Sequence, residues 1–372
     1  MELSLNKNWT VRQKGMKESY QTDVPAMVMD VLYKNGKVPD PYVGENEWIV
    51  YEELKNDFSF FNTFLLDEKM CNSDEVRLRC EGLDTIARIY INDTYLANTN
   101  DMHRTYCLDI KKLVHPGENS IRIEFQSAIT YALEQHEKEP YYSTSDTVDG
   151  FSLVRKAHCN YGWDWGPKLP DIGIWRNISI VTYDRGKLED VYIHQIHENG
   201  QVLLKMDVEA RKLEEADLTL EICVTDPDGK CMKKEYQTIK EKDIYEILVE
   251  NPQLWWCNGF GKQPLYKVNI VLKSGEEILD QTSKRIGLRT LTVRREKDKW
   301  GESFEFCING ISIFAMGANY IPEDCFYTRC SREKSEALIK QCVKANYNCI
   351  RVWGGGYFCE DYFYDLCDEY GL

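Results

Sequence analysis

The residues best suited to chemistry lie in one dense stretch, Arg155–Arg176, which reads RKAHCNYGWDWGPKLPDIGIWR. It places Asp164 between Trp163 and Trp165, with a glycine on the far side of each tryptophan. A carboxylate accepts two directed hydrogen bonds, as neighbouring sugar hydroxyls can donate, and indole rings offer flat faces for stacking. The stretch therefore predicts a saccharide-binding group. The alternative is a structural corner in which the tryptophans fill a core and Asp164 caps a turn.

A second group of polar and aromatic residues lies near the end of the sequence. Asn319 ends one short apolar run, Ile313–Asn319, and Arg351 lies within another, which ends at Trp353. Each run has the length of a buried strand, and each is followed by a loop and a helical pattern. Consecutive strand–helix units indicate a parallel sheet or a barrel. In a barrel, the carboxyl ends of the strands form the active-site face.

Two helices are expected to follow these strands. Ser331 is a suitable N-cap for the first helix, whose buried side should include Leu338 and Ile339. In the second helix, apolar residues at i, i+3, i+4 and i+7 from Phe363 mark one face. Gly371 then suits the position just after the last turn.

The first half of the chain, residues 1–185, predicts an all-β domain. Apolar residues alternate with polar ones over Ala87–Ile91 and Ile121–Phe125, which is typical of half-buried strands. Many short strands separated by turns favour a sandwich or a jelly roll. One helix is expected near Pro25–Asn35.

Two further domains are predicted. Residues 186–289 contain short alternating strands joined by hairpin turns, which fits an immunoglobulin-like sandwich without the antibody disulfide. Residues 290–372 begin with a polar hairpin, Lys297–Glu302, and continue into the strand–helix units. Those units would be the first part of an incomplete barrel, since a whole barrel needs about 250 residues.

Composition excludes several classes of partner. The 372 residues carry a net charge of −15 and contain no basic run, so no nucleic-acid partner is expected. No apolar run is long enough for a membrane span, and the N-terminus lacks the pattern of a signal peptide. The sequence therefore predicts a cytoplasmic protein, with no membrane partner and with its 14 cysteines as free thiols. Cysteine spacing predicts no metal site, and no cofactor is expected.

Five stretches together resemble the β-mannosidases of glycoside hydrolase family 2. Two of the five stretches are highly specific for this family, namely GWDWGPKLPDIGIWR and NYNCIRVWGGGYFCEDYFYDLCDEYGL. Similar segments are VPAMVMDVLYKNGKVPDPYVGENEW, IARIYINDTYLANTNDMHRTYCLDI and FAMGANYIPEDCF. Two positions depart from the family pattern, namely Ala26, where Gly is more usual, and Tyr320, where Trp is common. Relatives acting on β-galactosides or β-glucuronides carry a His-containing segment after the second-strand Arg, whereas this chain has Val352-Trp353-Gly354.

The resemblance implies a fold and a set of binding residues. It implies a jelly-roll sugar-binding domain, an immunoglobulin-like domain and a (β/α)8 barrel. Asp164 and Trp353 would face one cavity and bind the terminal mannose. Trp163, Trp165, Asn319 and Arg351 would complete the substrate-binding set, although Arg351 could equally serve only to orient neighbouring carboxylates.

The resemblance also implies retaining hydrolysis of terminal β-mannose by an acid/base Glu and a nucleophilic Glu. Both Glu residues come from later barrel strands, so they are expected beyond Leu372. No catalytic residue is assigned within the chain, which alone is expected to be inactive. One alternative is a non-catalytic carbohydrate-binding fragment. Another is a different family 2 specificity, such as an endo-acting mannosidase or an exo-glucosaminidase.

Overall fold

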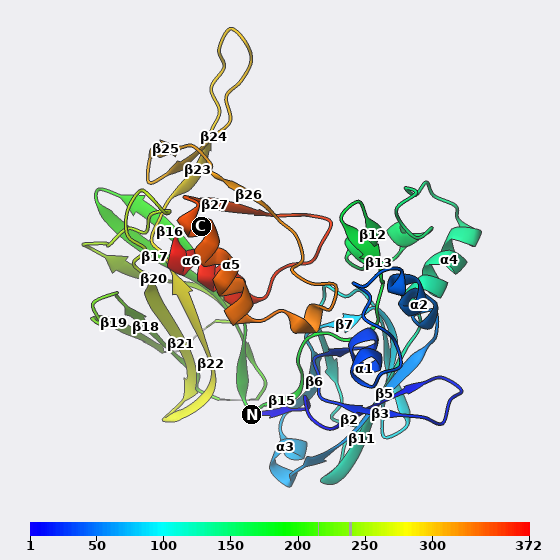
Figure 1. The fold of residues 1–372 in the computed structure, drawn as a ribbon. Helices are drawn as coiled ribbons and strands as arrows, with labels where there is room; N and C mark the ends of the chain where they lie inside the picture. The colour runs from blue at the N-terminus through cyan, green and yellow to red at the C-terminus, as the bar shows by residue number, and fades with distance from the viewer. Residues whose placement is uncertain (215, 238–239) are drawn as a thin grey trace. The chain divides into compact units, whose positions relative to one another are not determined.

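The computed structural model describes residues 1–214, 216–237 and 240–372, and β-strands dominate it (Figure 1). The backbone divides into two compact units, which are described one at a time. Unit 1 comprises Met1–Thr182, Ile321–Ser331 and Trp353–Phe358. Unit 2 comprises Tyr183–Tyr320, Arg332–Val352 and Cys359–Leu372. The domain boundaries predicted from the sequence, at residues 185 and 289, stay predictions.

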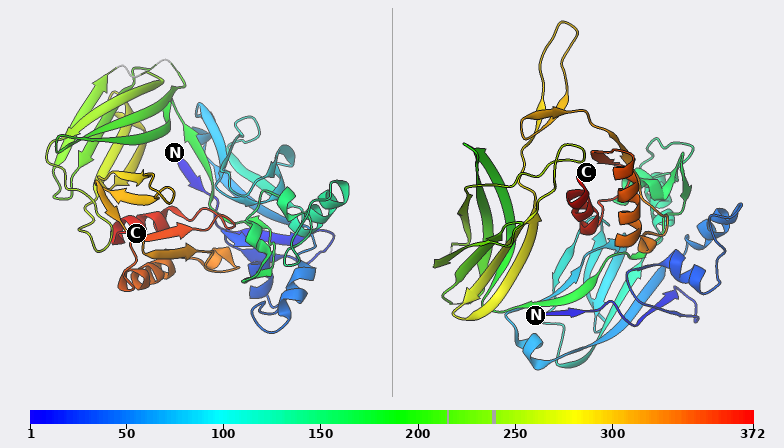
Figure 2. Two further views of the ribbon diagram at one scale, coloured as in Figure 1. Left: turned by 90° about the horizontal axis from the view of Figure 1, so that it is seen from above. Right: turned by 60° about the vertical axis from the view of Figure 1, so that its left-hand side comes forward.

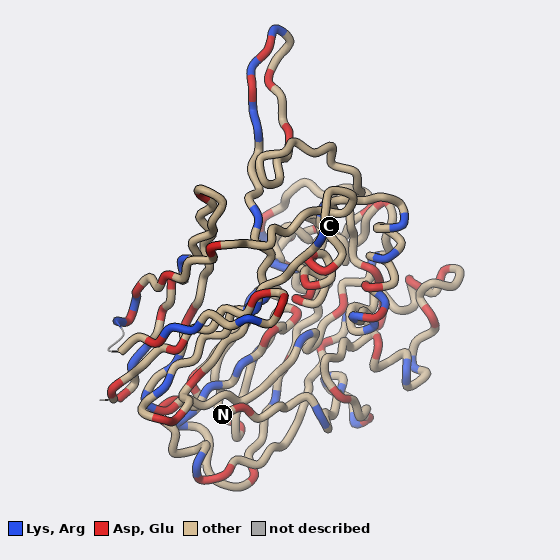
Figure 3. Tube along the Cα trace, turned by 90° about the vertical axis from the view of Figure 1, so that its left-hand side faces the viewer, with Lys and Arg blue, Asp and Glu red and all other residues tan. Residues whose placement is uncertain are grey.

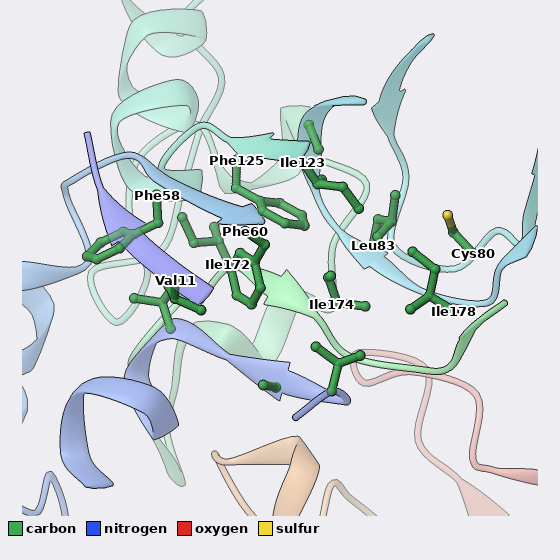
Figure 4. Close-up of a cluster of buried hydrophobic side chains, with 14 of the residues drawn as sticks. Val11, Phe58, Phe60, Cys80, Leu83, Ile123, Phe125, Ile172, Ile174 and Ile178 are labelled. Atoms are coloured by element: carbon green, nitrogen blue, oxygen red, sulfur yellow. The ribbon is translucent and has the colours of Figure 1, made fainter. Parts of the chain in front are cut away.

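Unit 1 is built around a β-sandwich, as the alternating residues predict. A six-stranded antiparallel sheet (β3-β2-β5-β11-β8-β9) and a four-stranded sheet (β1-β15-β6-β10) contribute to one apolar core. Alternate residues of β5 and β11, among them Phe58, Phe60 and Phe125, are buried, and Figure 4 shows them meeting Val11 and Ile174. The strands are β1 (Glu2–Ser4), β2 (Trp9–Gln13), β3 (Tyr20–Thr22), β5 (Phe58–Leu66), β6 (Glu75–Cys80), β8 (Ile86–Ile91), β9 (Thr94–Asn100), β10 (Tyr106–Asp109), β11 (Gly117–Phe125) and β15 (Ile178–Tyr183).

Short elements complete unit 1. The predicted first helix is confirmed as α1 (Val28–Lys34), which buries Val28–Leu32. The remaining helices are α2 (Asn46–Glu53), α3 (Glu68–Asn72), α4 (Ala128–Lys138), η1 (Phe151–Leu153), η2 (His158–Asn160) and η3 (Tyr327–Arg329). Two small sheets are β4-β14-β7, made of β4 (Ala26–Met27), β14 (Gly173–Ile174) and β7 (Leu83–Asp84), and the hairpin of β12 (Tyr161–Trp163) and β13 (Gly166–Lys168).

Unit 2 contains a second β-sandwich, with its two layers visible in Figure 2. A three-stranded sheet (β16-β17-β20) and a four-stranded sheet (β19-β18-β21-β22) share one core, to which Leu204, Ile222 and Ile270 contribute. The alternating runs of the sequence fall on β17, β18 and β21, as predicted. The strands are β16 (Gly186–Glu198), β17 (Gln201–Lys212), β18 (Thr219–Thr225), β19 (Cys231–Gln237), β20 (Lys242–Val249), β21 (Tyr266–Ser274) and β22 (Glu277–Ile286).

A disulfide joins Cys223 of β18 to Cys231 of β19, so the prediction that all cysteines are free thiols is wrong for this pair. The two strands are antiparallel neighbours joined by a short turn. This places the two Cα atoms 6.1 Å apart, within the range a disulfide needs. Within the described residues, the other twelve cysteines form no disulfide.

The rest of unit 2 holds a small antiparallel sheet and the strand–helix units. The sheet β23-β24-β25 follows the sandwich, and Lys297 pairs with Glu302 in the predicted polar hairpin. Strands β26 and β27 are parallel, as expected for consecutive strand–helix units. The elements are β23 (Leu291–Arg294), β24 (Glu305–Ile308), β25 (Ile311–Ile313), β26 (Gly317–Tyr320), α5 (Arg332–Lys344), β27 (Cys349–Val352) and α6 (Asp361–Tyr370).

The prediction of a single strand over Ile313–Asn319 is wrong, because the backbone changes the strand with which it pairs within this range. Strand β25 pairs with β24, and β26 pairs with β27. Between β25 and β26, the buried side chain of Asn348 satisfies two backbone groups. Its amide nitrogen donates to the carbonyl of Phe314 over 2.9 Å, and its oxygen accepts from the Met316 N–H over 2.9 Å. The Asn348 side chain therefore supplies hydrogen bonds to the backbone where strand pairing is interrupted.

The two helices agree with their predicted faces only in part. Phe363 and Leu366 of α6 are buried, and Gly371 adopts a left-handed conformation at the end of that helix, as predicted. Helix α5 buries Ile339 but leaves Leu338 exposed, so Leu338 was wrongly predicted as buried. The face of α5 that meets α6 centres on Ile339. Leu338 is offset from Ile339 by one helical position, about 100° around the axis.

Charge is distributed without segregation along the backbone. Figure 3 shows acidic and basic residues interspersed along the strands, including the hairpin between β23 and β24. Within residues 1–214, 216–237 and 240–372, no helix has both the length and the apolar character needed to cross a membrane.

Candidate functional site

Asp164 and Trp165 form the two-residue turn of the β12–β13 hairpin, in which Trp163 is paired with Gly166. Gly162 shapes the hairpin because its φ is +107°, and a side chain there would place Cβ 2.1 Å from the carbonyl oxygen of Asp146. Glycine is the residue that tolerates both constraints. The sequence G-W-D-W-G therefore holds Asp164 at the tip of a narrow hairpin.

The Asp164 side chain is exposed. Within the part of the chain that the structure describes, its carboxylate makes no hydrogen bond or ion pair, so it caps no turn there. Both oxygens keep their acceptor capacity for a ligand. The hairpin fixes the backbone of Asp164 and leaves the carboxylate available.

Trp353 packs against both tryptophans of the hairpin. Its ring centroid lies 5.1 Å from that of Trp163 and 5.6 Å from that of Trp165, with interplanar angles of 68° and 75°. These are edge-to-face contacts, which aromatic pairs favour. The structure thus brings Trp163, Trp165 and Trp353 together, within unit 1, at the hairpin whose turn carries Asp164.

Gly355 allows Trp353 to take this position. A Cβ atom on Gly355 would lie 1.9 Å from the six-membered ring of Trp353. The carbonyl of Gly355 also accepts a hydrogen bond from the Cys159 N–H over 3.0 Å. The glycine run after β27 is therefore required by close packing against the indole, in addition to ending the strand.

An aromatic cluster that the sequence did not reveal adjoins Trp353. Trp175, Tyr327 and Tyr357 contact one another, with ring centroids 5.2–6.2 Å apart. Arg176 lies over the Trp175 ring at 4.1 Å and donates to the carbonyl of Phe358 over 2.8 Å. In the sequence, only the family-like stretches that contain these residues could have pointed to them, because isolated tyrosines in loops form no periodic pattern.

A buried ion pair supports the segment that precedes the hairpin. Lys156 pairs with Asp84, both side chains are fully buried, and Lys156 Nζ also donates to the carbonyl of Asp171 over 2.9 Å. The Asp171 carboxylate accepts from the backbone N–H groups of Met29 and Ile172. Burial raises the pKa of Asp171 to about 7.

Asn319 and Arg351 lie opposite each other on the parallel strands β26 and β27 of unit 2. A guanidinium nitrogen of Arg351 donates to the side-chain oxygen of Asn319 over 3.0 Å, and both residues are exposed. The structure therefore brings this predicted pair together. The pair belongs to unit 2, whereas Asp164 and the three tryptophans belong to unit 1.

A β-sandwich that presents an unpaired carboxylate among tryptophan rings has the features of a carbohydrate-active protein. Two family models match the chain: one described as "Glycosyl hydrolase 2 galactose-binding domain-like" over residues 9–176, and one described as "Glycosyl hydrolases family 2" over residues 186–289. The chain belongs to glycoside hydrolase family 2, which confirms the resemblance seen in the sequence.

Curated relatives and a solved structure extend this finding. The chain is 31% identical over 388 residues to β-mannosidase B of Emericella nidulans, covering 99% of this chain and 45% of the relative. It is 29% identical to β-mannosidase of Bos taurus, covering 100% of this chain and 44% of the relative. The crystal structure of β-D-mannosidase from Dictyoglomus thermophilum matches with a TM-score of 0.94 and 30% identity, covering 100% of this chain and 46% of that one. The chain thus spans less than half the length of these relatives.

Proposed function

We propose that this chain provides the sugar-binding part of a retaining β-mannosidase that removes terminal β-D-mannose from β-mannosides. The observation that carries the proposal is the unpaired Asp164 carboxylate, flanked by Trp163 and Trp165 and backed by Trp353. The names of the relatives support mannose as the sugar.

In this proposal, Asp164 accepts hydrogen bonds from two hydroxyls of the terminal mannose. A charged acceptor strengthens both bonds, and the tryptophan rings limit the access of water. Trp353 supplies the wall of the mannose subsite, while Asn319 and the Arg351 that bonds to it contribute to substrate binding. Arg351 has a second possible role, namely fixing Asn319 without touching the sugar.

The chemistry would use two Glu residues on later strands, beyond Leu372. In retaining hydrolysis, one carboxylic acid protonates the leaving oxygen and a second carboxylate attacks the anomeric carbon. The proposed setting is a jelly-roll domain, an immunoglobulin-like domain and a (β/α)8 barrel, of which β26, α5, β27 and α6 would be the first two units. The parallel pairing of β26 with β27 supports the barrel assignment.

We also propose a cytoplasmic location, which is supported by the twelve cysteines that form no disulfide in the described part of the chain. The disulfide between Cys223 and Cys231 counts against it. Locating the tagged protein by fractionation would decide this point.

The test of function is hydrolysis of a panel of aryl β-glycosides by the polypeptide of the whole reading frame. Preferential release of mannose is expected. Preference for a glucosaminide or galactoside would favour a different family 2 specificity. No release from any aryl glycoside, together with cleavage of internal linkages in a β-mannan oligosaccharide, would favour an endo-acting enzyme.

A non-catalytic carbohydrate-binding protein is the second candidate. The sandwich of unit 1 and its open Asp164 favour it, because binding needs neither of the two Glu residues. Saccharide binding without hydrolysis of any glycoside by the whole reading frame would select this candidate over the enzyme.

A further inference from the structure

A groove of about 570 Å³ lies on the six-stranded sheet of unit 1, toward the end where β11 leads into α4. Its volume falls within the roughly 300–1,000 Å³ of typical ligand-binding clefts. None of the residues predicted to bind the substrate borders it, so the cavity predicted to be shared by Asp164 and Trp353 stays a prediction. The lining residues that matter for its chemistry are Ser59, Arg88, Asn98, Asn100, Glu124 and Tyr131.

A row of polar side chains crosses this part of the sheet. Four residues are paired in register on the adjacent strands β5, β11, β8 and β9, in the order Ser59, Glu124, Arg88 and Asn98. Because neighbouring strands lie about 4.8 Å apart, three such spacings give the row a length of about 14 Å. Phe58 and Phe125, the chain neighbours of Ser59 and Glu124, point into the core in Figure 4. The row therefore lies on the opposite face of the sheet, outside the core.

Arg88 carries a charge that the protein leaves unpaired. The charged residues of the lining are two cations and two anions, namely Lys14, Arg88, Asp57 and Glu124. Lys14 Nζ lies 3.0 Å from an Asp57 carboxylate oxygen, and Glu124 pairs with Arg122. The exposed Arg88 guanidinium makes neither a hydrogen bond nor an ion pair within residues 1–214, 216–237 and 240–372. Its donors are therefore open to a ligand.

Exposed amides lie beside Arg88. Asn98 and Asn100 are two residues apart on β9, both are exposed, and neither side chain has a hydrogen-bond partner in the described part of the chain. Each amide can both donate and accept. Tyr131 of α4 is half-buried and adds a ring and a hydroxyl to the lining. The groove thus offers donors, acceptors and an aromatic ring to one ligand.

Specific contacts hold one end of the groove in place. One Asp57 carboxylate oxygen accepts from the Ser127 N–H over 3.0 Å, and the other accepts from Lys14 Nζ. Ser127 is the N-cap of α4, and its hydroxyl donates to the carbonyl of Leu54 over 2.6 Å. These contacts fix the start of α4, which carries Tyr131. A preformed site of this kind reduces the entropic cost of binding a ligand.

The lining selects the chemical class of the ligand. Arg88 and Glu124 are cross-strand neighbours, so an anion beside Arg88 would also face a carboxylate, and a cation beside Glu124 would face a guanidinium. A ligand of either net charge therefore meets a group of like sign. Sugar hydroxyls donate and accept, so a neutral chain of sugar rings can bond to both residues and extend along the row.

We propose that this groove is an accessory site for a neutral oligosaccharide, held by Arg88, Asn98 and Asn100 on the sheet and by Tyr131 of α4. The choice of a β-mannoside as that oligosaccharide rests on the proposed function, whereas the groove is built from residues outside the predicted substrate-binding set. Such a site would hold a long or branched saccharide on the protein through residues other than those at the β12–β13 hairpin.

The test measures binding to the 372-residue chain carrying Asp164→Ala, which removes the proposed sugar ligand of the hairpin. β-1,4-Linked mannotriose, β-1,4-linked cellotriose and inorganic phosphate are titrated by ligand-observed NMR. Adding Arg88→Ala is expected to raise Kd about 10-fold or more for the trisaccharide that binds, because hydrogen bonds from a charged donor are lost. Its Tm should not change, since Arg88 has no partner within the described residues.

Arg104→Ala is the matched control, because Arg104 is also an exposed arginine of unit 1 but does not border the groove. It should leave Kd unchanged. No binding of either trisaccharide, equal Kd values with and without the Arg88 guanidinium, or Arg88-dependent binding of phosphate alone would overturn the proposal. Arg88-dependent binding of cellotriose alone would uphold the accessory site while contradicting the choice of mannose. Arg88-dependent binding of mannotriose, in a protein whose whole reading frame hydrolyses no β-mannoside, would uphold the site and contradict the proposed enzyme.

Discussion

Trp353 lies edge-on against Trp163, with 5.1 Å between the ring centroids, although the two residues come from opposite halves of the sequence. Trp165 completes the group from the other end of the same turn. Three indoles thus pack together at the hairpin that carries the exposed Asp164 carboxylate.

Replacing Gly355 should disturb the tryptophan group. In Gly355→Ala, the new Cβ would meet the Trp353 ring at 1.9 Å, so the indole must move. Overpacking of this kind costs about 1–3 kcal/mol. A lower Tm and a changed tryptophan fluorescence spectrum are expected. Gly354→Ala is the control, because a Cβ at Gly354 meets nothing within 4 Å, and an equal effect of both changes would contradict the explanation.

Removing the Asp164 carboxylate should lower activity and leave the stability of the fold unchanged. In the polypeptide of the whole reading frame, Asp164→Ala should lower kcat/KM for an aryl β-mannoside. The drop should correspond to a loss of about 1–3 kcal/mol of transition-state stabilisation, because hydrogen bonds to a charged group are removed. Its Tm should stay unchanged because the carboxylate has no partner within the described residues. Unchanged kinetics would assign Asp164 no role in binding the sugar.

Breaking the buried ion pair should destabilise the protein strongly. Lys156→Met leaves Asp84 buried without its partner, which costs about 3–5 kcal/mol. Lys7→Met is the control, because the Lys7–Asp23 pair is exposed and solvent screening leaves such a pair little net stabilising effect. Urea unfolding measures the unfolding free energy of both variants. Similar decreases for the two variants would show that the buried Lys156–Asp84 pair contributes no more to stability than the exposed pair.

The buried Asp171 should make stability depend on pH. Its pKa is about 7 in the folded state and returns toward 3.8 on unfolding. Between these values the folded state keeps a proton that the unfolded state has lost, so the contribution of this group to the unfolding free energy falls as pH rises. Asp171→Asn should therefore lose less stability than the native chain between pH 4 and pH 7. Parallel curves in urea unfolding over that range would contradict this assignment.

Much of the fold follows from periodicity, while the site follows from it only in part. Alternation over Ile121–Phe125 predicted a strand because burial on one face imposes a period of two. The break after Ile313 was missed because it depends on Asn348, whose effect on the backbone is local and carries no periodic signal. The apolar run placed Trp353 at the end of a strand, and family resemblance alone gave it a role in binding the sugar.

Other features could be recognised only in the folded structure. Tyr327 could not be singled out, since a tyrosine in a loop carries no periodic signal and its ring contacts with Trp175 and Tyr357 form only in the folded protein. The Cys223–Cys231 disulfide arises from the register of one hairpin, which spacing does not determine. Sequence patterns thus predicted which strands form, but not which side chains meet.

The most direct test of the central claim is real-time ¹H NMR of an aryl β-D-mannoside cleaved by the polypeptide of the whole reading frame. Mannose is expected to appear first as the β-anomer, because two successive displacements, by carboxylate and then by water, retain the configuration. Mannose appearing first as the α-anomer, or no cleavage of the β-mannoside while another β-glycoside is hydrolysed, would contradict it.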